Sequence, residues 1–493
     1  MSTAERKHIR HLQTAITHLE TKFSSNITRH KKYFHASPAE DVYAILPRHI
    51  IQEFVPPQEQ HQHHIDSTDS KSNGDSTAVM LSSDSQLVNS ILKYSSNPSL
   101  RKQVYMEAHT ACPENIQVLE ELRKVRHELA VTLGYSSYAE RFLHDKMAKT
   151  PQTVQKFLNN MSQRIKPFAQ RDYETLLEAK RYYEGTTNST LEPWDIAFYT
   201  NLVKSKSHGF DSSTLIPYFS IENCLEGISL LVKHLFGIQL VQEEAVSSTE
   251  LWSPTVRKLS LHHEVEGNLG IIYLDLLPRP DKYVHAAHFT IRCGCAVYPN
   301  GASVHDTSNS NSTSPSSASN FGEKLKFQLP VVALVTNLST NSSSSSDTSA
   351  NSSNPNLLTH SEVETLFHEL GHALHSLLSR TKFQHLSGTR CAVDFVETPS
   401  HLMENFCWDE RFVQMFAKHY LSKVPLPDEL AKKLANSRCL FQNLEIQNQI
   451  VYAQLDQAQN LLSKPSSMRK DNSTKFQNFA WGITNFSNSC CMK

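Results

Sequence analysis

The feature that most constrains the fold is a five-residue motif, His368-Glu369-Leu370-Gly371-His372. Ser361 and Glu364, just before it, have the Ser-x-x-Glu spacing of a capping box, so we expect a helix from Ser361 to about Arg380. Residues four apart share one face of a helix, and two such histidines can therefore bind one ion at about 2.0 to 2.1 Å. The motif predicts a metal-binding helix; histidines that only pack in a core are the alternative.

Glu369 lies between the two histidines and is placed to accept a proton from water at the metal, as a general base does. A peptidase zinc needs three protein ligands and one open position. His375 lies a turn further along and is not expected to reach the same ion, and Leu378 excludes the pattern with a third histidine six residues after the second. We take Glu397 as the candidate third ligand.

Glu397 lies in the run Asp394 to Ser400, which is expected to open a second helix that continues through Trp408. Glu404 follows Glu397 by seven residues and shares its helix face. It is expected either to orient a ligating histidine or to be an ordinary carboxylate facing solvent. The residues leave both interpretations open.

Composition limits the possible partners. The 493 residues carry a formal net charge of -1, which gives no basic field for nucleic acid or anionic lipid. No apolar stretch reaches the eighteen or so residues of a membrane span. The nine cysteines are odd in number and scattered, which favours a reducing compartment. Cys293 and Cys295 resemble half a metal site, but no second pair follows at finger spacing.

Three regions are expected along the chain. Residues 1-250 are mainly helical, with a mobile loop at 58-77 that holds a His61, His63 and His64 cluster. Residues 251-462 form the catalytic region, with strands at 270-277 and 329-338 and disordered insertions at 300-320 and 339-354. Residues 463-493 form a divergent, aperiodic tail.

Several short runs resemble one known family. The run from His368 to His375, then Ser387-Gly388-Thr389, and then Asp394 to Ser400 are similar to the thimet oligopeptidase and neurolysin family of zinc peptidases. Within that family, Arg380 to His385 and Gly388 to Cys391 are most similar to the mitochondrial intermediate peptidases. Upstream runs such as His288 to Arg292 extend the resemblance to roughly residues 1 to 457.

This resemblance implies a mainly α, neurolysin-like zincin: a helical ellipsoid with a deep channel and a small β-sheet beside the zinc-binding helix. It implies one Zn²⁺ per chain held by His368, His372 and Glu397, with Glu369 as the base. Gly388 and Thr389 would lie in a loop near bound peptide, although Gly388 is equally compatible with an ordinary turn. The expected partner is a peptide or precursor-protein substrate, and no nucleic acid is expected. The chain would have no membrane span and would be a monomer.

The resemblance also implies a mitochondrial matrix enzyme that trims short N-terminal peptides from imported precursors. The first residues do not read as a transit peptide, and no His or Tyr follows Tyr452, where the family places groups that stabilise the reacting oxygen. We therefore expect that the C-terminal part of the fold is missing. Two alternatives to the processing enzyme stay open: a truncated, catalytically weak zinc-binding isoform or fragment, and a cytosolic oligopeptidase.

Overall fold

The computed structural model describes most of residues 1-461. Placement is not described for residues 30-31, 47-50, 52-77, 84, 111, 209-211, 245-248, 280-281, 283-284, 298-325, 339-355 and 462-493. The expected loop at 58-77, the insertions at 300-320 and 339-354, and the tail at 463-493 lie outside the described residues, either wholly or for the most part.

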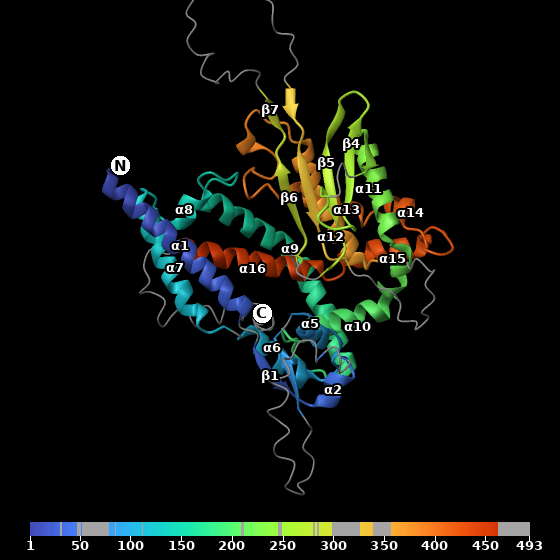
Figure 1. Ribbon diagram of the computed structural model, residues 1–493. Coiled ribbons are helices and arrows are strands. Elements are labelled where there is room, and N and C mark those ends of the chain that lie inside the picture. The colour runs from blue at the N-terminus through green and yellow to red at the C-terminus, as the bar shows by residue number, and fades with distance from the viewer. Residues whose placement is uncertain are drawn as a thin grey trace, which may run out of the picture. The chain divides into compact units, whose positions relative to one another are not determined.

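The chain divides into two compact units, shown together in Figure 1. The first comprises Met1–Gly209 and Cys439–Lys493, and the second comprises Phe210–Arg438. The His368 to His372 motif and the run from Asp394 to Trp408 belong to the second unit. Each unit is described by itself below.

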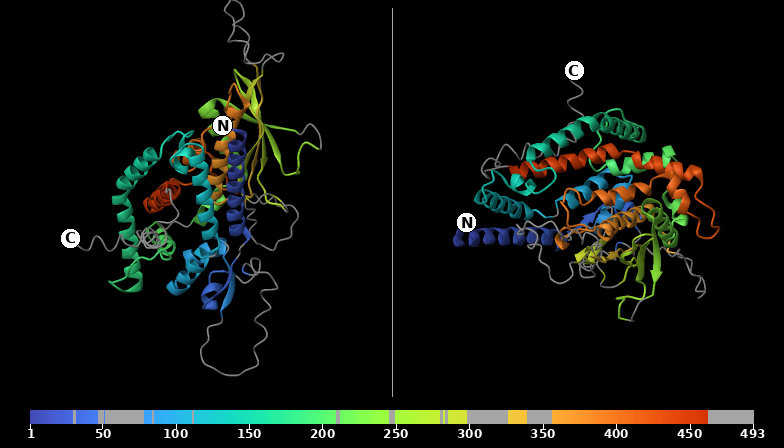
Figure 2. Two further views of the ribbon diagram at one scale, coloured as in Figure 1. Left: turned by 90° about the vertical axis from the view of Figure 1, so that its left-hand side faces the viewer. Right: turned by 90° about the horizontal axis from the view of Figure 1, so that it is seen from above.

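The first unit is helical, with a two-stranded sheet. Its elements are α1 (Thr3–Arg29), β1 (Tyr33–Ala36), α2 (Ala39–Tyr43), β2 (Val79–Ser82), α5 (Ser85–Tyr94), α6 (Pro98–His109), α7 (Asn115–Thr132), α8 (Tyr138–Leu143), α9 (Pro151–Glu184), α10 (Ile196–His208) and α16 (Gln442–Leu461). Strands β1 and β2 pair antiparallel. Helix α1 packs along α7, and α9 packs along α16, as the two views of Figure 2 show.

Local sequence explains where the longest helix of this unit begins and ends. Thr150 caps the N-terminus of α9 by accepting a hydrogen bond from the backbone N–H of Thr153, and Pro151 occupies the first turn. The helix ends at Gly185, whose φ of 65° is readily adopted only by glycine. Between these signals its apolar residues recur at helical spacing, and Leu176 becomes fully buried.

The second unit combines one five-stranded sheet with helices. Its elements are η2 (Ser212–Tyr218), α11 (Ile221–Phe236), β3 (Ile238–Glu243), β4 (Arg257–His263), β5 (Gly267–Asp275), β6 (Ala287–Arg292), β7 (Cys295–Val297), β8 (Lys326–Gln328), β9 (Val331–Val335), α12 (His360–Leu378), η5 (Gln384–Leu386), α13 (Thr398–Phe406), α14 (Glu410–Phe416) and α15 (Asp428–Cys439). The strand order is β3-β4-β5-β9-β6, with only β5 and β9 parallel.

Helix α12 lies against this sheet and contacts β5, β6 and β9. It begins one residue before the predicted Ser361, because Thr359 and Glu362 form the capping box: the Thr359 hydroxyl accepts from the N–H of Glu362, and the Glu362 carboxylate accepts from the N–H of Thr359. The predicted Ser361 and Glu364 pair is therefore not the cap. The predicted helix itself is present, as His360–Leu378.

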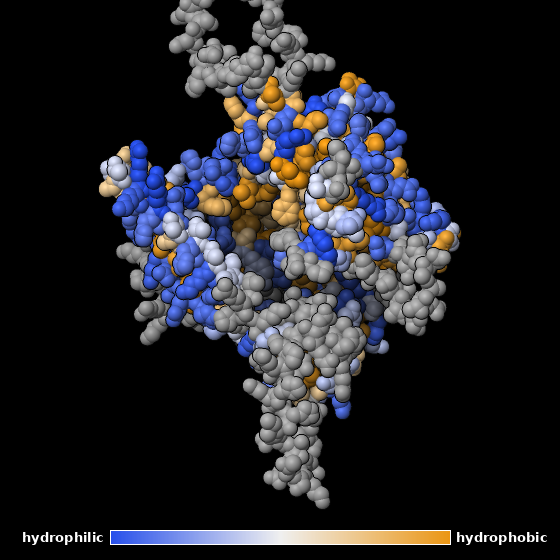
Figure 3. All heavy atoms as spheres, in the orientation of Figure 1, coloured by the Kyte–Doolittle hydropathy of each residue, from blue (hydrophilic) through white to orange (hydrophobic). Residues whose placement is uncertain are grey.

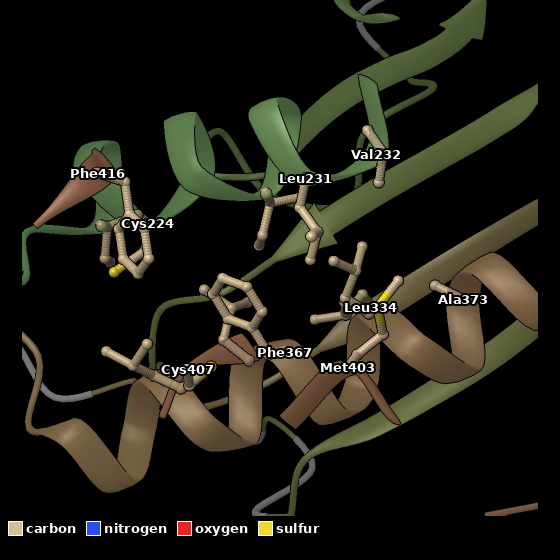
Figure 4. Packing of buried hydrophobic residues seen from close by; sticks show 14 of the residues in the cluster. Cys224, Leu231, Val232, Leu334, Phe367, Ala373, Met403, Cys407 and Phe416 are labelled. Atoms are coloured by element: carbon tan, nitrogen blue, oxygen red, sulfur yellow. The ribbon is translucent and has the colours of Figure 1, made fainter. Parts of the chain in front are cut away.

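The apolar face of α12 anchors the core of this unit. Phe367 is fully buried, and its ring stacks on Phe416 of α14 at a centroid distance of 5.9 Å. Figure 4 shows this ring pointing from α12 toward Cys224 and Leu231 of α11. Burying a side chain of this size stabilises a fold by roughly 3 to 5 kcal/mol relative to alanine. Helix α12 is thus fixed by its own core-facing residues.

The predicted fold class, mainly α with a small sheet beside the motif helix, is confirmed. The deep channel stays a prediction. None of the described helices is both long and apolar enough to cross a membrane. On the face drawn in Figure 3, apolar side chains reach the surface over β6, β7 and β8, where Phe289, Ile291, Val297 and Phe327 are exposed.

Candidate metal centre

Helices α12 and α13 approach each other closely at Gly371. A Cβ atom at Gly371 would lie 2.5 Å from the Cα of Ser400, far inside van der Waals contact. A glycine is therefore required here because the backbone of α13 occupies the space of a side chain. This approach places Glu397, the N-cap residue of α13, opposite the histidines of α12.

Three ligand atoms converge between the helices. His372 Nε2 lies 3.0 Å from Glu397 Oε2, His368 Nε2 lies 3.4 Å from the same oxygen, and the two Nε2 atoms are 3.2 Å apart. Bonds of 2.0 to 2.1 Å to a tetrahedral Zn²⁺ require ligand atoms roughly 3.3 Å apart. The nitrogen and oxygen set and its spacing fit one zinc ion, and these residues are the three predicted as ligands.

The carboxylate of Glu397 is held by its own helix. Ser400 Oγ lies 2.8 Å from both the Glu397 carbonyl oxygen and Oε2, and donates to this residue. Burial alone would raise the pKa of Glu397, but the Ser400 hydrogen bond and the nearby His372 and His368 lower it overall. Glu397 is therefore ionised and oriented, as a metal ligand must be.

A second carboxylate supports the first histidine. Glu404 Oε1 lies 2.5 Å from His368 Nδ1, which leaves His368 Nε2 facing Glu397. The exposed His401 contacts both oxygens of Glu404 at 3.1 Å. His368, His401 and Glu404 form a second cluster of potential ligand atoms, but its His368 nitrogen is already hydrogen-bonded to Glu404. Of the two interpretations of Glu404, the contact favours orientation of a histidine.

Glu369, between the two histidines in the sequence, is buried. Its side chain is 7% exposed, and burial raises the pKa of Glu369 above its usual value, with the negative charge of Glu397 adding to the rise. The nearby His368 and, to a smaller extent, the backbone of His288 on β6 lower the pKa of Glu369 and oppose this shift. A carboxyl group with a raised pKa can take up and return a proton more readily near neutral pH.

Burial also changes the pKa values of three histidines near the centre. Burial lowers the pKa of His372 and of His375, and lowers the pKa of His288 to about 4, with His372 and His375 adding to the shift at His288. Neutral imidazoles are the form that ligates metals. His375 belongs to neither cluster of potential ligands among the described residues, as its spacing indicated.

The remaining predicted residues lie beside the centre. Gly388 has a φ of 63°, donates its N–H to Ser379 Oγ at 2.9 Å, and packs on Ser376 of α12. Thr389 follows it in a turn before α13. This geometry is that of a turn glycine tied to the end of α12. The role of both residues near a peptide stays a prediction.

Three residues of this region were not predicted. Ser400 and His288 lie in runs that carried the family resemblance, but only their contacts with Glu397 and Glu369 show a role. His401 precedes Glu404 by three residues, the spacing of neighbours on a helix, which is the only signal that the sequence offered. Cys293 and Cys295 join no cluster of potential metal ligands among the described residues.

A metallopeptidase-type centre is thus defined by a His-Glu-x-x-His helix, a glutamate from the next helix and a second carboxylate behind the first histidine. Residues 91–478 match the pattern of Peptidase family M3. The chain belongs to Peptidase family M3, and the resemblance found in the sequence is confirmed.

The curated relatives include mitochondrial intermediate peptidases from a plant, an animal and a fungus. That of Arabidopsis thaliana is 36% identical over 91% of this chain and 58% of its own length. The Homo sapiens protein is 37% identical over 69% of this chain and 43% of its own length, and the Neurospora crassa protein is 37% identical over 72% and 45%. The chain therefore spans about half the length of the curated relatives it matches.

Proposed function

We propose that this chain is a zinc metalloendopeptidase of the oligopeptidase type, with one Zn²⁺ held by His368, His372 and Glu397. The observation that carries the proposal is the convergence of two Nε2 atoms and one carboxylate oxygen within 3.0 to 3.4 Å of one another. Zinc bound there would supply a Lewis acid for the scissile carbonyl and for water. Family membership supports the same reaction class.

The protein's own contribution to the reaction is proton transfer by Glu369. Its buried carboxylate accepts a proton from the attacking water and returns that proton to the nitrogen of the leaving amine. The backbone of His288 on β6 lies beside this carboxylate and lowers the pKa of Glu369, which opposes part of the effect of burial. The raised pKa of Glu369 favours the protonated form that the second transfer needs.

Strand β6 offers a binding edge for the peptide. It is the last strand of the sheet in the order β3-β4-β5-β9-β6, and it contacts α12 beside the motif. The free edge of a β-strand presents N–H and C=O groups that pair with an extended peptide. Because these are main-chain contacts, they suit hydrolysis of many sequences, with Gly388 and Thr389 proposed to border the bound peptide.

The finer substrate proposal is N-terminal trimming of imported precursor proteins in the mitochondrial matrix. It rests on relatives named mitochondrial intermediate peptidases and on the resemblance of the Arg380 to His385 and Gly388 to Cys391 runs. A precursor with an N-terminal extension should lose a short peptide from its first residues, which N-terminal sequencing or mass spectrometry detects. Random internal cleavage would favour the cytosolic peptide-degrading alternative, and imaging of the full-length gene product would test location.

The central test compares the purified chain with Glu369→Gln. We expect one zinc per chain in both proteins, because Glu369 is not a ligand, and a loss of roughly 10² to 10⁴ in the hydrolysis of quenched fluorogenic peptides by the variant. Glu410→Gln, at the half-buried first residue of α14, is the matched control and should cleave like the parent. Equal cleavage by Glu369→Gln would contradict the proposed mechanism. Stoichiometric zinc without any hydrolysis would favour the zinc-binding alternative.

A further inference from the structure

One ring nitrogen of a proposed metal ligand lacks the partner that such ligands have. Histidines that bind a metal through one nitrogen almost always donate the other N–H to an acceptor, which fixes the ring and its tautomer. His368 obeys this rule through Glu404. His372 Nδ1 is shielded from solvent and has no hydrogen-bond partner among the described protein groups. A buried N–H left unpaired is destabilising, because it loses its hydrogen bond to water and gains none in return, so an acceptor is required.

His288 supplies a matching orphan on the neighbouring strand. Its Nε2 is also buried and without a partner among the described protein groups. The rings of His288 and His372 are 6.4 Å apart between centroids and inclined by 31°. At this distance between ring centroids, His288 Nε2 and His372 Nδ1 do not form a direct hydrogen bond. One water that forms a hydrogen bond of about 2.9 Å with each nitrogen would connect them.

The local environment suits one buried water. His375 Nδ1 is a third buried nitrogen without a partner among the described protein groups, and helical side chains lean toward the N-terminus, which brings this ring toward His372. A buried water typically makes about three hydrogen bonds to such groups. Ser376 Oγ is also buried and has no partner among the described protein groups, so it is the rival acceptor that Ser376→Ala tests.

We propose that His288 is a positioning residue for the metal ligand His372, acting through one buried water between His288 Nε2 and His372 Nδ1. This inference rests on the proposed zinc site. The water accepts the N–H of His372 Nδ1 and donates to His288 Nε2, so that the His372 Nε2 lone pair faces the metal. The main chain of the same residue lies beside Glu369, so β6 is close to both the base and a ligand.

The test measures zinc binding and not turnover. Zinc affinity of the purified chain is measured by competition with a chromophoric chelator, and the visible spectrum of the Co²⁺-substituted chain reports ligand geometry. His288→Phe keeps the ring volume without an acceptor and should weaken zinc binding 10- to 100-fold, with an altered Co²⁺ spectrum. His288→Gln keeps a polar terminus and should stay within about threefold of the parent.

Two controls separate positioning from folding. Phe289→Leu changes the adjacent residue of the same strand, whose side chain points to the opposite sheet face, and should bind zinc like the parent. Thermal unfolding of the metal-free proteins should be similar for His288→Phe and His288→Gln. If both variants lose affinity equally, or if both unfold early, His288 has a packing role and the inference is wrong.

The remaining outcomes are equally decisive. Unchanged zinc affinity in His288→Phe overturns the inference, and a loss in Ser376→Ala that matches the expected His288→Phe effect moves the acceptor role to Ser376. A parent chain that binds zinc but hydrolyses no peptide contradicts the proposed function and leaves the role of His288 standing. A parent chain that binds no zinc overturns both.

Discussion

Glu404 Oε1 lies 2.5 Å from His368 Nδ1, while His368 Nε2 faces Glu397 Oε2 at 3.4 Å. One imidazole thus links two carboxylates through its two nitrogens. The contact with Glu404 places the proton on Nδ1 and leaves the lone pair of Nε2 for a metal. Burial would raise the pKa of Glu404, but hydrogen bonds with His401 and His368 lower it overall, so the carboxylate is ionised and acts as the acceptor.

Glu404→Ala should weaken zinc binding roughly 10- to 100-fold, because His368 loses the group that orients it. Helix α13 should persist, since its packing depends on other residues such as the buried Met403. Chelator competition measures the affinity, and circular dichroism checks the helices. Glu410→Ala, at the half-buried first residue of α14, is the control. Full zinc affinity in Glu404→Ala would show that the contact does not position His368.

Gly371→Ala should separate α12 from α13. The added methyl group would lie 2.5 Å from the Cα and 2.9 Å from the backbone nitrogen of Ser400, and a backbone cannot yield as a side chain does. Overpacking of this kind costs typically 1 to 3 kcal/mol, and the displaced Glu397 should lose its contact with His372. We expect a lower melting temperature together with weakened zinc binding. A variant that retains parental stability and zinc affinity would disprove the close approach.

Gly388→Ala should destabilise the chain through its backbone. At φ 63° an alanine is strained by roughly 1 to 2 kcal/mol, and its Cβ would lie 2.7 Å from Ser376 Oγ. Urea unfolding should therefore show a reduced free energy of unfolding. Thr389→Val probes the proposed peptide contact separately: a raised KM with unchanged stability supports the loop role, and an unchanged KM argues that this segment is only a turn.

Asp275→Asn should destabilise the second unit in a pH-dependent way. Burial would raise the pKa of Asp275, but Arg279, Trp252 and Lys282 lower it from 3.8 to about 2. Stability from a depressed carboxyl pKa is fully present above the unfolded value and is lost as pH falls through the folded value. The shift corresponds to roughly 2 kcal/mol, and the buried Lys282 left behind adds to the cost.

Urea unfolding of the parent and Asp275→Asn at pH 7 should thus show a difference of at least about 2 kcal/mol. The difference should shrink between about pH 4 and pH 2, where the parent carboxylate takes up a proton. Asp428→Asn, in the first turn of α15, is the control. A difference that does not depend on pH would show that the charge of Asp275 contributes little.

Much of the site could be predicted because it depends on residues that lie close together in the sequence. The i, i+4 spacing of His368 and His372 required only helical periodicity, and α12 is a helix across both residues. Local signals of the same kind, the Thr150 cap and Gly185, bound α9. The start of α12 was misplaced by one residue because Thr359 competes with Ser361 as a cap, and both have a glutamate three positions on.

Contacts between distant segments could not be predicted by such signals. Sheet pairing brings β9 beside β5 although about sixty residues separate their partners, and β6 then takes the edge beside α12. His288 reaches the centre only through this order. His401 and Ser400 acquire their contacts because α13 turns back onto α12 at Gly371.

Local sequence patterns were enough to predict the chemistry of the candidate site, namely two histidines and a glutamate on one helix. They also predicted the mainly helical fold class and the family. Those properties depend on spacing within a few residues, where backbone geometry is nearly constant. Only the tertiary structure decided which atoms of Glu397, Glu404 and His288 face the histidines. The distance between segments that are far apart in the sequence depends on how whole helices and strands pack. At Gly371 the absence of a side chain allows α12 and α13 to approach closely, but this matters only once the core is assembled.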